Sequence, residues 1–482
     1  MSKMRWCVKA STFLVLWAAT AVSLPAQTFT SLHNFDIRDG QYPWSPLLQG
    51  IDGNLYGTTE NGGAFINACL RGCGTIFKIT PTGTLTTVHN FNGTDGSEIV
   101  GGLAQDVHGN LYGVTNTGGT SGRGTVFKMA RSGQFTTLFN FTVFTGYGPQ
   151  GGLVLASDGN FYGTAGIGGP SAGVCHPGCG TIFRITPKGR FTLLHTFNGY
   201  PDGGLPLGVL IQAPDGRLYG TASDLGTANG YGTVYSITLT GKFTVVHQFN
   251  NTDGAYPFAG LVLGSDGNFY GQTDLGGASA YGAYGTVFKM TPAGEVTTLH
   301  SFEETDGDNP VANLVEGTDG NFYGTASYGG THPNFGTIFQ ITPSGTFTTQ
   351  HNFDSADGSY PYAGLIQATD GNFYAETFAG GTINDVCPFG CGTVYSLSMK
   401  LGPFVQTLPI SGTVGAAVDI LGTNLAGATS VTFNGVAAAF TVKSPFEITT
   451  KVPAGTTTGP VVVETPAGTL KSKATFYVKV KP

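Results

Sequence analysis

Short runs of hydrophobic residues, interrupted by turn residues, recur along most of the chain. Residues 258–302 contain four such runs: FAGLVLGS, NFYGQT, GTVFKMT and EVTTLHSF. Each run is rich in β-branched and aromatic residues and is short for a helix, so each predicts a β-strand. The dipeptide Asp266-Gly267, between the first two runs, is typical of a tight hairpin turn. The pattern therefore predicts a four-stranded antiparallel sheet.

The two middle strands of this unit carry large side chains at neighbouring positions. Phe269 precedes Tyr270 in one strand, and Val287 precedes Phe288 in the other. Neighbouring side chains of a strand point to opposite faces of the sheet, so both faces must be covered. Sheets that stack side by side meet this requirement, whereas a sandwich with one face in water does not.

The same unit occurs seven times, each marked by DGNFYG or a close variant. The tyrosines of this signature are Tyr56, Tyr112, Tyr162, Tyr219, Tyr270, Tyr323 and Tyr374. Repeats of this length build either a linear solenoid or a closed propeller. Residues 28–35 resemble a fourth strand with no strands before it, and the last repeat stops after its third strand. We therefore predict a seven-bladed β-propeller over residues 28–400, with four strands per blade, closed by the N-terminal strand. A solenoid would need polar caps, and none is recognisable.

The repeat unit GLVLGSDGNFYG…GG…GTVFKMTPAGEVTTLHSF resembles the GloVer tandem repeats of exported bacterial proteins. The resemblance covers residues 28–399, and all seven copies show it. It implies an exported protein. It implies no particular reaction, because no chemistry is established for the family.

Residues 401–482 lack the repeat and consist of short β-branched runs separated by turns, which predicts a small β-sandwich. The stretches ILGTNLAGATSVTFNG, VPAGTTTGPVVVETPAG and ATFYV resemble the IPT/TIG immunoglobulin-like domain. In exported bacterial proteins this resemblance implies a spacer or adhesion module.

The N-terminus has the features of a secretory signal peptide. Basic residues are followed by an apolar run and then by small residues, so we predict removal of residues 1–26. An uncleaved membrane anchor is the alternative. A signal peptide implies a secreted, cell-surface or periplasmic protein with no membrane span after cleavage. We expect a monomer. Charged residues make up 11% of the chain and the net charge is −7 without a basic cluster, which argues against binding to nucleic acid.

Six of the seven cysteines form three Cys-x3-Cys pairs, each just before the third strand of a repeat. The expected disulfides are Cys69–Cys73, Cys175–Cys179 and Cys387–Cys391. These three loops are the longest of their kind in the chain, and a long loop loses more entropy on ordering, so a covalent brace is the favoured interpretation. Zinc or a redox centre are the alternatives. Zinc needs four ligands, and each pair supplies two sulfurs.

Two other sets of polar residues recur with the repeat. The histidines of the fourth strand are His33, His89, His195, His247, His300 and His351. We interpret these as structural, since the fourth strand of a propeller is its outermost. Aspartates recur in the linker that follows this strand. Their role is either to form the turn or to bind calcium. Glu60 and Asp274, just after the second strand, are the best candidates for a catalytic carboxylate pair.

Function is expected on the face that carries the variable loops between the second and third strands. Aromatic residues on these loops suit sugar rings or protein partners, although packing between blades is their alternative role. The candidate ligand-binding residues are Trp44, Tyr231, Tyr281, Tyr284, Tyr328 and Phe389. We expect a non-enzymatic binding or structural protein whose ligand is a carbohydrate or another surface protein. The alternative is a hydrolase or lyase acting on a polysaccharide or small ester. The sequence indicates no catalytic residue, metal ligand or cofactor.

Overall fold

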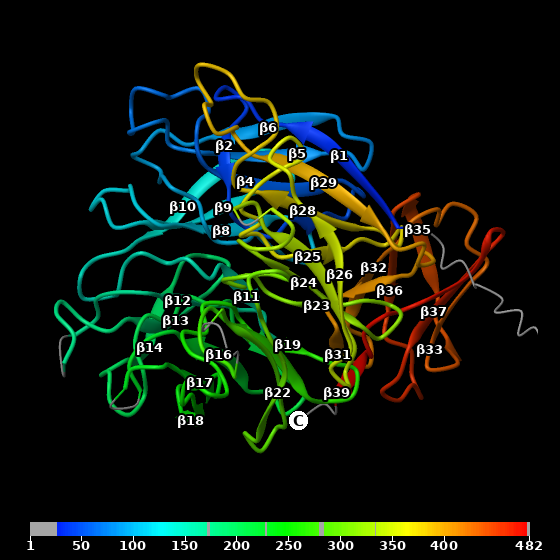
Figure 1. The fold of residues 1–482 in the computed structure, drawn as a ribbon. Coiled ribbons are helices and arrows are strands. Elements are labelled where there is room, and N and C mark those ends of the chain that lie inside the picture. The colour runs from blue at the N-terminus through cyan, green and yellow to red at the C-terminus, as the bar shows by residue number, and fades with distance from the viewer. Residues whose placement is uncertain (1–26, 171–173, 227–228, 279–283, 333, 480–482) are drawn as a thin grey trace, which may run out of the picture.

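The computed structural model describes residues 27–170, 174–226, 229–278, 284–332 and 334–479. This part of the chain is all β, as predicted (Figure 1). It contains no helix long and apolar enough to cross a membrane. The predicted signal peptide lies outside the described residues.

In the described residues, the repeats fold into seven antiparallel sheets, of which the first has five strands and the other six have four. The first sheet contains β3 (Leu48–Gln49), β4 (Leu55–Asn61), β5 (Thr75–Ile79) and β6 (Leu85–Asn90), with β2 (Gln41–Pro43) also paired to β4. The second contains β7 (Ala104–Gln105), β8 (Leu111–Thr115), β9 (Thr125–Met129) and β10 (Phe135–Asn140). The third contains β11 (Leu153–Leu155), β12 (Phe161–Ala165), β13 (Thr181–Ile185) and β14 (Phe191–Thr196). The fourth contains β15 (Ile211–Gln212), β16 (Leu218–Ala222), β17 (Thr233–Ile237) and β18 (Phe243–Gln248).

The last three sheets repeat this arrangement with one exception. The fifth contains β19 (Val262–Leu263), β20 (Phe269–Thr273), β21 (Thr286–Met290) and β22 (Val296–Ser301). The sixth contains β23 (Val315–Glu316), β24 (Phe322–Ala326), β25 (Thr337–Ile341) and β26 (Phe347–Asn352). The seventh contains β27 (Ile366–Gln367), β28 (Phe373–Thr377) and β29 (Thr393–Ser398), and its fourth strand is β1 (Thr28–Asn34) from the start of the repeats. β1 pairs antiparallel with β29, from Thr28 opposite Ser398 to Asn34 opposite Thr393.

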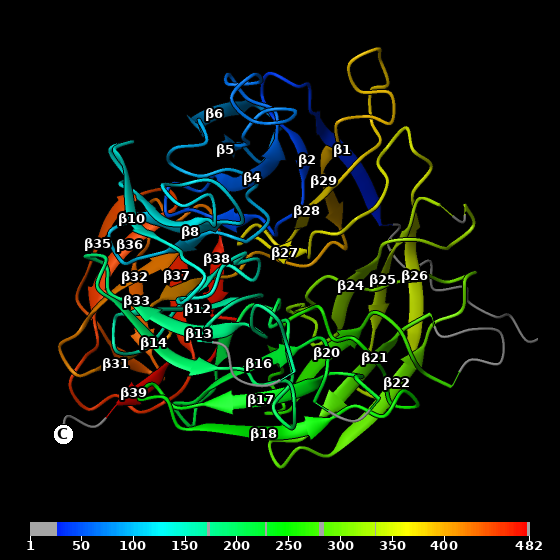
Figure 2. The same ribbon diagram turned by 90° about the vertical axis from the view of Figure 1, so that its left-hand side faces the viewer.

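The sheets follow one another around a common centre in chain order (Figure 2). A buried hydrophobic cluster lies between each pair of consecutive sheets. A further cluster joins the seventh sheet to the first, through residues such as Tyr374 and Val394 on one side and Leu55 and Phe77 on the other. Both faces of the inner strands are therefore covered, as the paired large residues predicted.

The tyrosine of each repeat signature fastens the hairpin turn that precedes it. Tyr270 donates a hydrogen bond from its hydroxyl to Asp266 Oδ2 at 2.8 Å, and Asp266 Oδ1 accepts the backbone N–H of Asn268. In the second repeat His108 replaces this aspartate, and Asp106 accepts the hydroxyl of Tyr112 instead, at 3.0 Å. The motif thus encodes a hydrogen bond that ties the hairpin turn to a tyrosine of the following strand.

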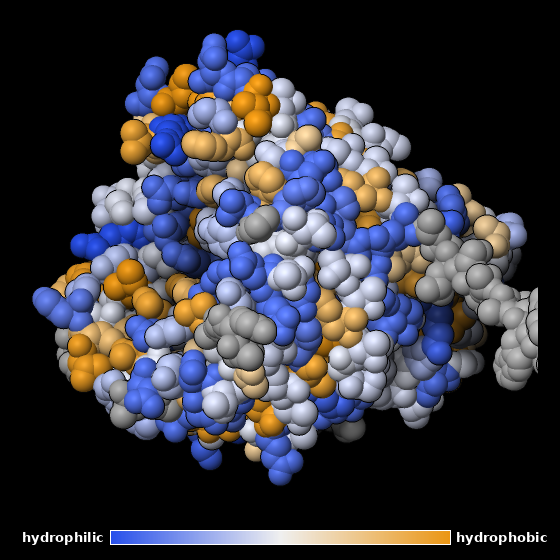
Figure 3. Space-filling view, in the orientation of Figure 1, coloured by the Kyte–Doolittle hydropathy of each residue, from blue (hydrophilic) through white to orange (hydrophobic). Residues whose placement is uncertain are grey.

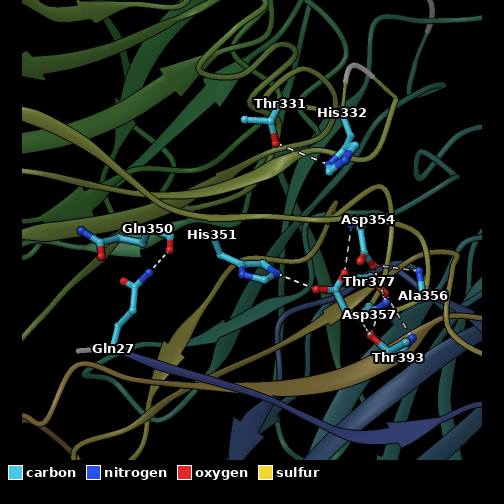
Figure 4. Close-up of polar contacts among 10 residues, drawn as sticks. All are labelled: Gln27, Thr331, His332, Gln350, His351, Asp354, Ala356, Asp357, Thr377 and Thr393. Carbon is cyan, nitrogen blue, oxygen red and sulfur yellow. Dashed lines mark hydrogen bonds and ion pairs between the residues drawn. The ribbon is translucent and has the colours of Figure 1, made fainter.

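The histidines of the fourth strands pair with the linker aspartates. The pairs are His33–Asp39, His89–Asp95, His195–Asp202, His247–Asp253, His300–Asp306 and His351–Asp357, with Nε2–Oδ2 distances of 2.8–3.1 Å. Figure 4 shows the last pair, in which Asp357 also accepts the backbone N–H of Asp354, while the Asp357 carbonyl accepts the hydroxyl of Thr393. Each pair therefore fixes the linker against the next sheet, in keeping with the structural interpretation of the histidines.

Residues 404–479 form separate sheets with a core of their own. One sheet has the order β30 (Gln406–Leu408), β32 (Ala417–Leu421), β36 (Glu447–Lys451) and β35 (Phe440–Ser444). The other has the order β34 (Val436–Ala437), β33 (Ser430–Phe433), β37 (Val461–Thr465) and β38 (Gly468–Lys471), and β31 (Ser411–Thr413) pairs in parallel with β39 (Tyr477–Lys479). Buried residues from both four-stranded sheets, such as Ile420 and Val463, share one hydrophobic cluster.

This C-terminal region contacts the face of the repeats that carries the Asp-Gly turns. Arg131 lies 3.4 Å from Glu447, and the hydroxyls of Thr369 and Thr423 are 2.9 Å apart. Lys479 donates to the carbonyl of Ser157 at 3.4 Å. The second, seventh and third sheets therefore all contact the region, which leaves the opposite face, with its long loops, uncovered by these contacts.

Candidate functional site

One linker residue of each repeat has a left-handed backbone conformation. The residues are Tyr42, Glu98, Gly148, Leu205, Tyr256, Asn309 and Tyr360, with φ between 50° and 63°. Only one of the seven is glycine, the residue that adopts this conformation without a steric cost. Strained residues of this kind persist where the surrounding structure fixes them, and they gather at functional sites.

The residue two positions further along in each repeat lines a cavity. This ring consists of Trp44, Val100, Gln150, Leu207, Phe258, Val311 and Tyr362. Because all seven repeats contribute, the cavity lies on the axis that the sheets share. Its volume is about 640 Å³, which is in the range of small-molecule sites. The left-handed residues thus direct one side chain per repeat into a common space.

Aromatic residues cover one arc of the cavity wall. Trp44 and Tyr362 stack with ring centroids 4.3 Å apart, and Phe378 meets Trp44 edge-on at 5.2 Å. The hydroxyls of Tyr328 and Tyr362 lie 2.9 Å apart. The structure therefore brings together two of the predicted ligand-binding residues, Trp44 and Tyr328, and joins them through Tyr362.

Polar groups lie next to this aromatic arc. Asp274 follows β20, and its Oδ1 accepts a hydrogen bond from Asn309 Nδ2 at 2.7 Å. Burial raises the pKa of Asp274 above its ordinary value, against the effect of that hydrogen bond. Burial also raises the pKa of the neighbouring Asp308 to about 6, with further contributions from the charges of Asp274 and Glu304.

Glu60 and Asp274 do not form the catalytic pair considered from the sequence. The acidic neighbour of Glu60 is Glu98, whose charge adds to burial in raising the pKa of Glu60 to about 7. The acidic neighbour of Asp274 is Asp308, in a different part of the ring. Asp274 lines the cavity, whereas Glu60 is outside its lining.

The predicted disulfides are present, and their position in the structure explains their use. Cys69–Cys73, Cys175–Cys179 and Cys387–Cys391 are joined, with Cα–Cα distances of 5.1–5.3 Å. The carbonyl oxygens of Cys73, Cys179 and Cys391 accept the N–H groups of the left-handed residues Glu98, Leu205 and Tyr42. Each brace therefore holds the loop that supports one segment of the cavity wall.

Tyr231 and Tyr284 occupy this same position in repeats without cysteine. Their carbonyl oxygens accept the N–H groups of Tyr256 and Asn309, at 3.0 and 3.3 Å. Both side chains are half-buried and pack against clusters between sheets. They support the wall without lining the cavity, and Tyr281, the third candidate from these loops, lies outside the described residues.

Phe389 is 73% exposed and lies on a braced loop, away from the cavity lining. Other exposed apolar side chains, including Leu70 and Ile383, also lie on the braced loops. In the space-filling view, hydrophobic residues at the top of the molecule lie over the loops above β2 and β6, among hydrophilic ones (Figure 3).

Several residues that line the cavity were not predicted from the sequence, including Tyr362, Asn309, Gln150 and Phe258. Their common feature is position, since each lies three to six residues before the first strand of its repeat. Among the described residues, no group of three or more His, Cys, Asp or Glu side chains is arranged to hold a metal ion.

A sequence profile of the Gloeobacter/Verrucomicrobia repeat matches the chain twice, over residues 19–175 and 171–389. The chain belongs to this repeat family. The Gloeobacter/Verrucomicrobia repeat match confirms the resemblance as far as residue 389, and it ends before the C-terminal sheets. No curated protein matches this repeat protein in sequence.

Several solved structures are similar to this Gloeobacter/Verrucomicrobia repeat protein at low identity. A gluconolactonase from Xanthomonas campestris is 13% identical with a TM-score of 0.39, over 65% of this chain and 91% of its own. A luciferin-regenerating enzyme is 12% identical with a TM-score of 0.41, over 79% of this chain and 98% of its own. PorZ, a surface component of the type-IX secretion system of Porphyromonas gingivalis, is 13% identical with a TM-score of 0.44, over 89% of this chain and 58% of its own. These TM-scores are too low for the likenesses to bear on function.

Proposed function

We propose that the chain is an exported, non-enzymatic binding protein that captures a carbohydrate, or part of another surface protein, in the axial cavity. In this proposal the seven sheets are the blades of a closed β-propeller, the C-terminal region is an IPT/TIG-like domain, and residues 1–26 are a signal peptide. The hydrophobic cluster between the seventh and first sheets supports closure. The three disulfides support export, because disulfides persist in oxidising compartments.

The observation that carries the proposal is the composition of the cavity wall. Aromatic rings, aliphatic side chains and a few convergent polar groups line it, and Asp274 is the one charged residue among the described residues that do so. Such a wall is typical of sites that bind small ligands through ring contacts and hydrogen bonds. Binding should therefore change little with salt concentration, since few Coulombic contacts would be screened.

A glycan-array screen of the parent protein and the Trp44→Ala variant tests the proposal. We expect signals for the parent that the variant loses, because Trp44 forms half of the stacked pair on the wall. Pro292→Ala, in a turn on the opposite face, is the matched control and should retain the signals. Equal signals from Trp44→Ala and the parent, with equal melting temperatures, would show that the ligand binds elsewhere.

Hydrolysis is the second candidate function. It is favoured by one observation, the raised pKa of Asp308 beside Asp274, because a general acid works best with a pKa near the ambient pH. Incubation of array-positive oligosaccharides with the parent and with Asp308→Asn tests it. Products that form with the parent and not with the variant would favour the enzyme, whereas intact oligosaccharide favours the binding protein.

A further inference from the structure

One part of the cavity wall combines a flat apolar surface with a carboxylate–amide pair. Trp44 and Tyr362 provide the stacked rings, and Tyr328 bonds to the hydroxyl of Tyr362. Asp274 and Asn309 lie on the same part of the wall, close enough to Tyr362 for the Asp274 charge to act on its hydroxyl. The ring face and the polar pair are therefore available to one ligand at once.

The polar pair retains hydrogen-bonding capacity after its internal contact. Asn309 Nδ2 donates to Asp274 Oδ1 at 2.7 Å, and Asn309 is the one side-chain donor to this carboxylate within the described ranges. Asp274 Oδ2 can therefore accept from a ligand, while the Asn309 amide retains one N–H donor and a carbonyl acceptor. Two acceptors and one donor side by side match two neighbouring hydroxyl groups, each of which both donates and accepts.

The charge of the wall restricts the ligand further. No lysine, arginine or histidine is among the described residues that line the cavity, and Asp274 is the one carboxylate. An anionic ligand would place its charge beside Asp274 without a compensating cation, which is costly in a partly buried site. Uronic acids, sulfated sugars and phosphates are therefore disfavoured.

We propose that Trp44, Tyr362, Asp274 and Asn309 form a subsite for one uncharged pyranose residue, held through two adjacent hydroxyl groups. The apolar C–H face of the sugar lies against the aromatic rings. One hydroxyl donates to Asp274 Oδ2, and its neighbour exchanges hydrogen bonds with the Asn309 amide. The inference deepens the carbohydrate-binding function proposed above and depends on it.

Calorimetric titration of the full chain with five probes of three charge classes tests the subsite. The probes are neutral hexaoses of glucose, xylose and mannose, the cationic chitosan hexaose and the anionic hexamer of galacturonic acid. We expect a neutral hexaose to bind most tightly. Asp274→Asn should weaken its binding roughly tenfold to hundredfold, because a hydrogen bond to a charged acceptor is lost. Glu60→Gln is the matched control, since Glu60 occupies the same repeat position outside the cavity, and it should bind as the parent does.

The outcomes separate this inference from the proposed function. Binding of a neutral hexaose that Trp44→Ala weakens and Asp274→Asn does not would overturn the subsite and leave the cavity as a carbohydrate site. Tightest binding of the chitosan or galacturonate probe would overturn the uncharged ligand. No binding of any probe would overturn both the subsite and the carbohydrate as the ligand of the cavity. Melting temperatures of each variant, measured in parallel, exclude loss of folding as the cause.

Discussion

Glu376 in β28 differs in charge from its counterparts in the other six repeats. These are Thr58, Val114, Thr164, Thr221, Gln272 and Thr325. Glu376 is fully buried, and neither carboxylate oxygen has a hydrogen-bond partner among the described residues. Its Oε1 lies against Gly57 of the first sheet, where an added Cβ would come within 2.5 Å. Burial raises its pKa well above the ordinary value of 4.5.

We expect Glu376→Thr to stabilise the protein, by about 1–3 kcal/mol, because it removes an unpartnered buried polar group. The gain should grow with pH. A carboxyl group with a raised folded pKa imposes no penalty below its unfolded pKa, and the penalty increases as the pH rises toward the folded pKa. Urea unfolding at pH 4 and pH 8 measures this. Equal stability of variant and parent at both pH values would contradict the expectation.

Asp106 replaces the missing turn aspartate of the second repeat, so its removal should destabilise that turn. Asp106→Ala leaves the buried hydroxyl of Tyr112 without its partner, and we expect a loss of about 1–3 kcal/mol in the free energy of unfolding. Adding His108→Asp restores the aspartate of the other repeats and should recover most of the loss. Thermal unfolding of the single and double variants measures these changes. A double variant no more stable than Asp106→Ala would show that the hydrogen bond between aspartate and tyrosine does not stabilise the turn.

The sequence predicted the turn aspartates and the buried signature tyrosines, because both follow from hairpin chemistry and hydrophobic pattern. It did not predict Asp106, which lies two positions before the expected place. Nor did it predict the His–Asp pairs, such as His351 with Asp357, because a spacing of six residues does not reveal that the linker turns back against its own strand.

Among the elements, β1 completes the seventh sheet, so its deletion should expose the edge of β29. Phe29 of β1 stacks on His351 at 3.9 Å, which ties the sixth and seventh sheets together. We expect a protein without residues 28–35 to melt at a lower temperature and to aggregate, because unpaired edge strands invite association. Calorimetry and light scattering measure both effects. A melting temperature equal to that of the parent would contradict closure by β1.

The disulfide braces constrain small loops, so their loss should be mild. We expect Cys387→Ser with Cys391→Ser to cost at most about 2 kcal/mol, because a short loop restricts the unfolded chain little. The seven sheets should remain folded, while proteolysis at the loop becomes faster. Limited proteolysis and near-ultraviolet circular dichroism distinguish these effects. Global unfolding of the variant would show that the brace supports more than its own loop.

The number and order of strands could be predicted because each repeat carries its own turns and periodicity. The length of the first strand could not. The run at residues 258–265 predicted a full strand, yet β19 contains only Val262 and Leu263. The preceding residues, including Phe258, line the cavity instead of pairing.

At the scale of the whole molecule, the C-terminal region covers the turn face of the repeats. We expect removal of residues 401–482 to lower the melting temperature of the repeats. Arg131 would lose its ion pair with Glu447, and Gly53 would lose its apolar contact with Phe446. Ligand binding at the cavity should persist, since no residue of this region lines it. Calorimetry with and without ligand measures both, and loss of binding in a folded truncated protein would contradict this separation.

The position of the cavity could not be predicted from the sequence, although three of its residues, Trp44, Tyr328 and Asp274, were candidates. Trp44 and Tyr328 belong to distant repeats and meet only because the sheets follow one another around a centre. The left-handed linker residues that direct the wall are mostly tyrosine, leucine, glutamate or asparagine, so composition did not reveal them. A single repeat contributes too little of the wall to identify a site.

The pairing of β1 with β29 has a consequence for the order of biosynthesis. Ribosomes make β1 before the other strands of the repeats, yet its partner β29 is the last of those strands to be made. Contacts between such distant segments form slowly, and folding units that depend on them remain incomplete for longer. During synthesis, β1 therefore remains without its partner strand until nearly the whole repeat region has been made. A chain that ends in the sixth repeat would lack β29, and β1 would then have no partner strand. Correct folding of the first strand therefore depends on complete synthesis of the last repeat.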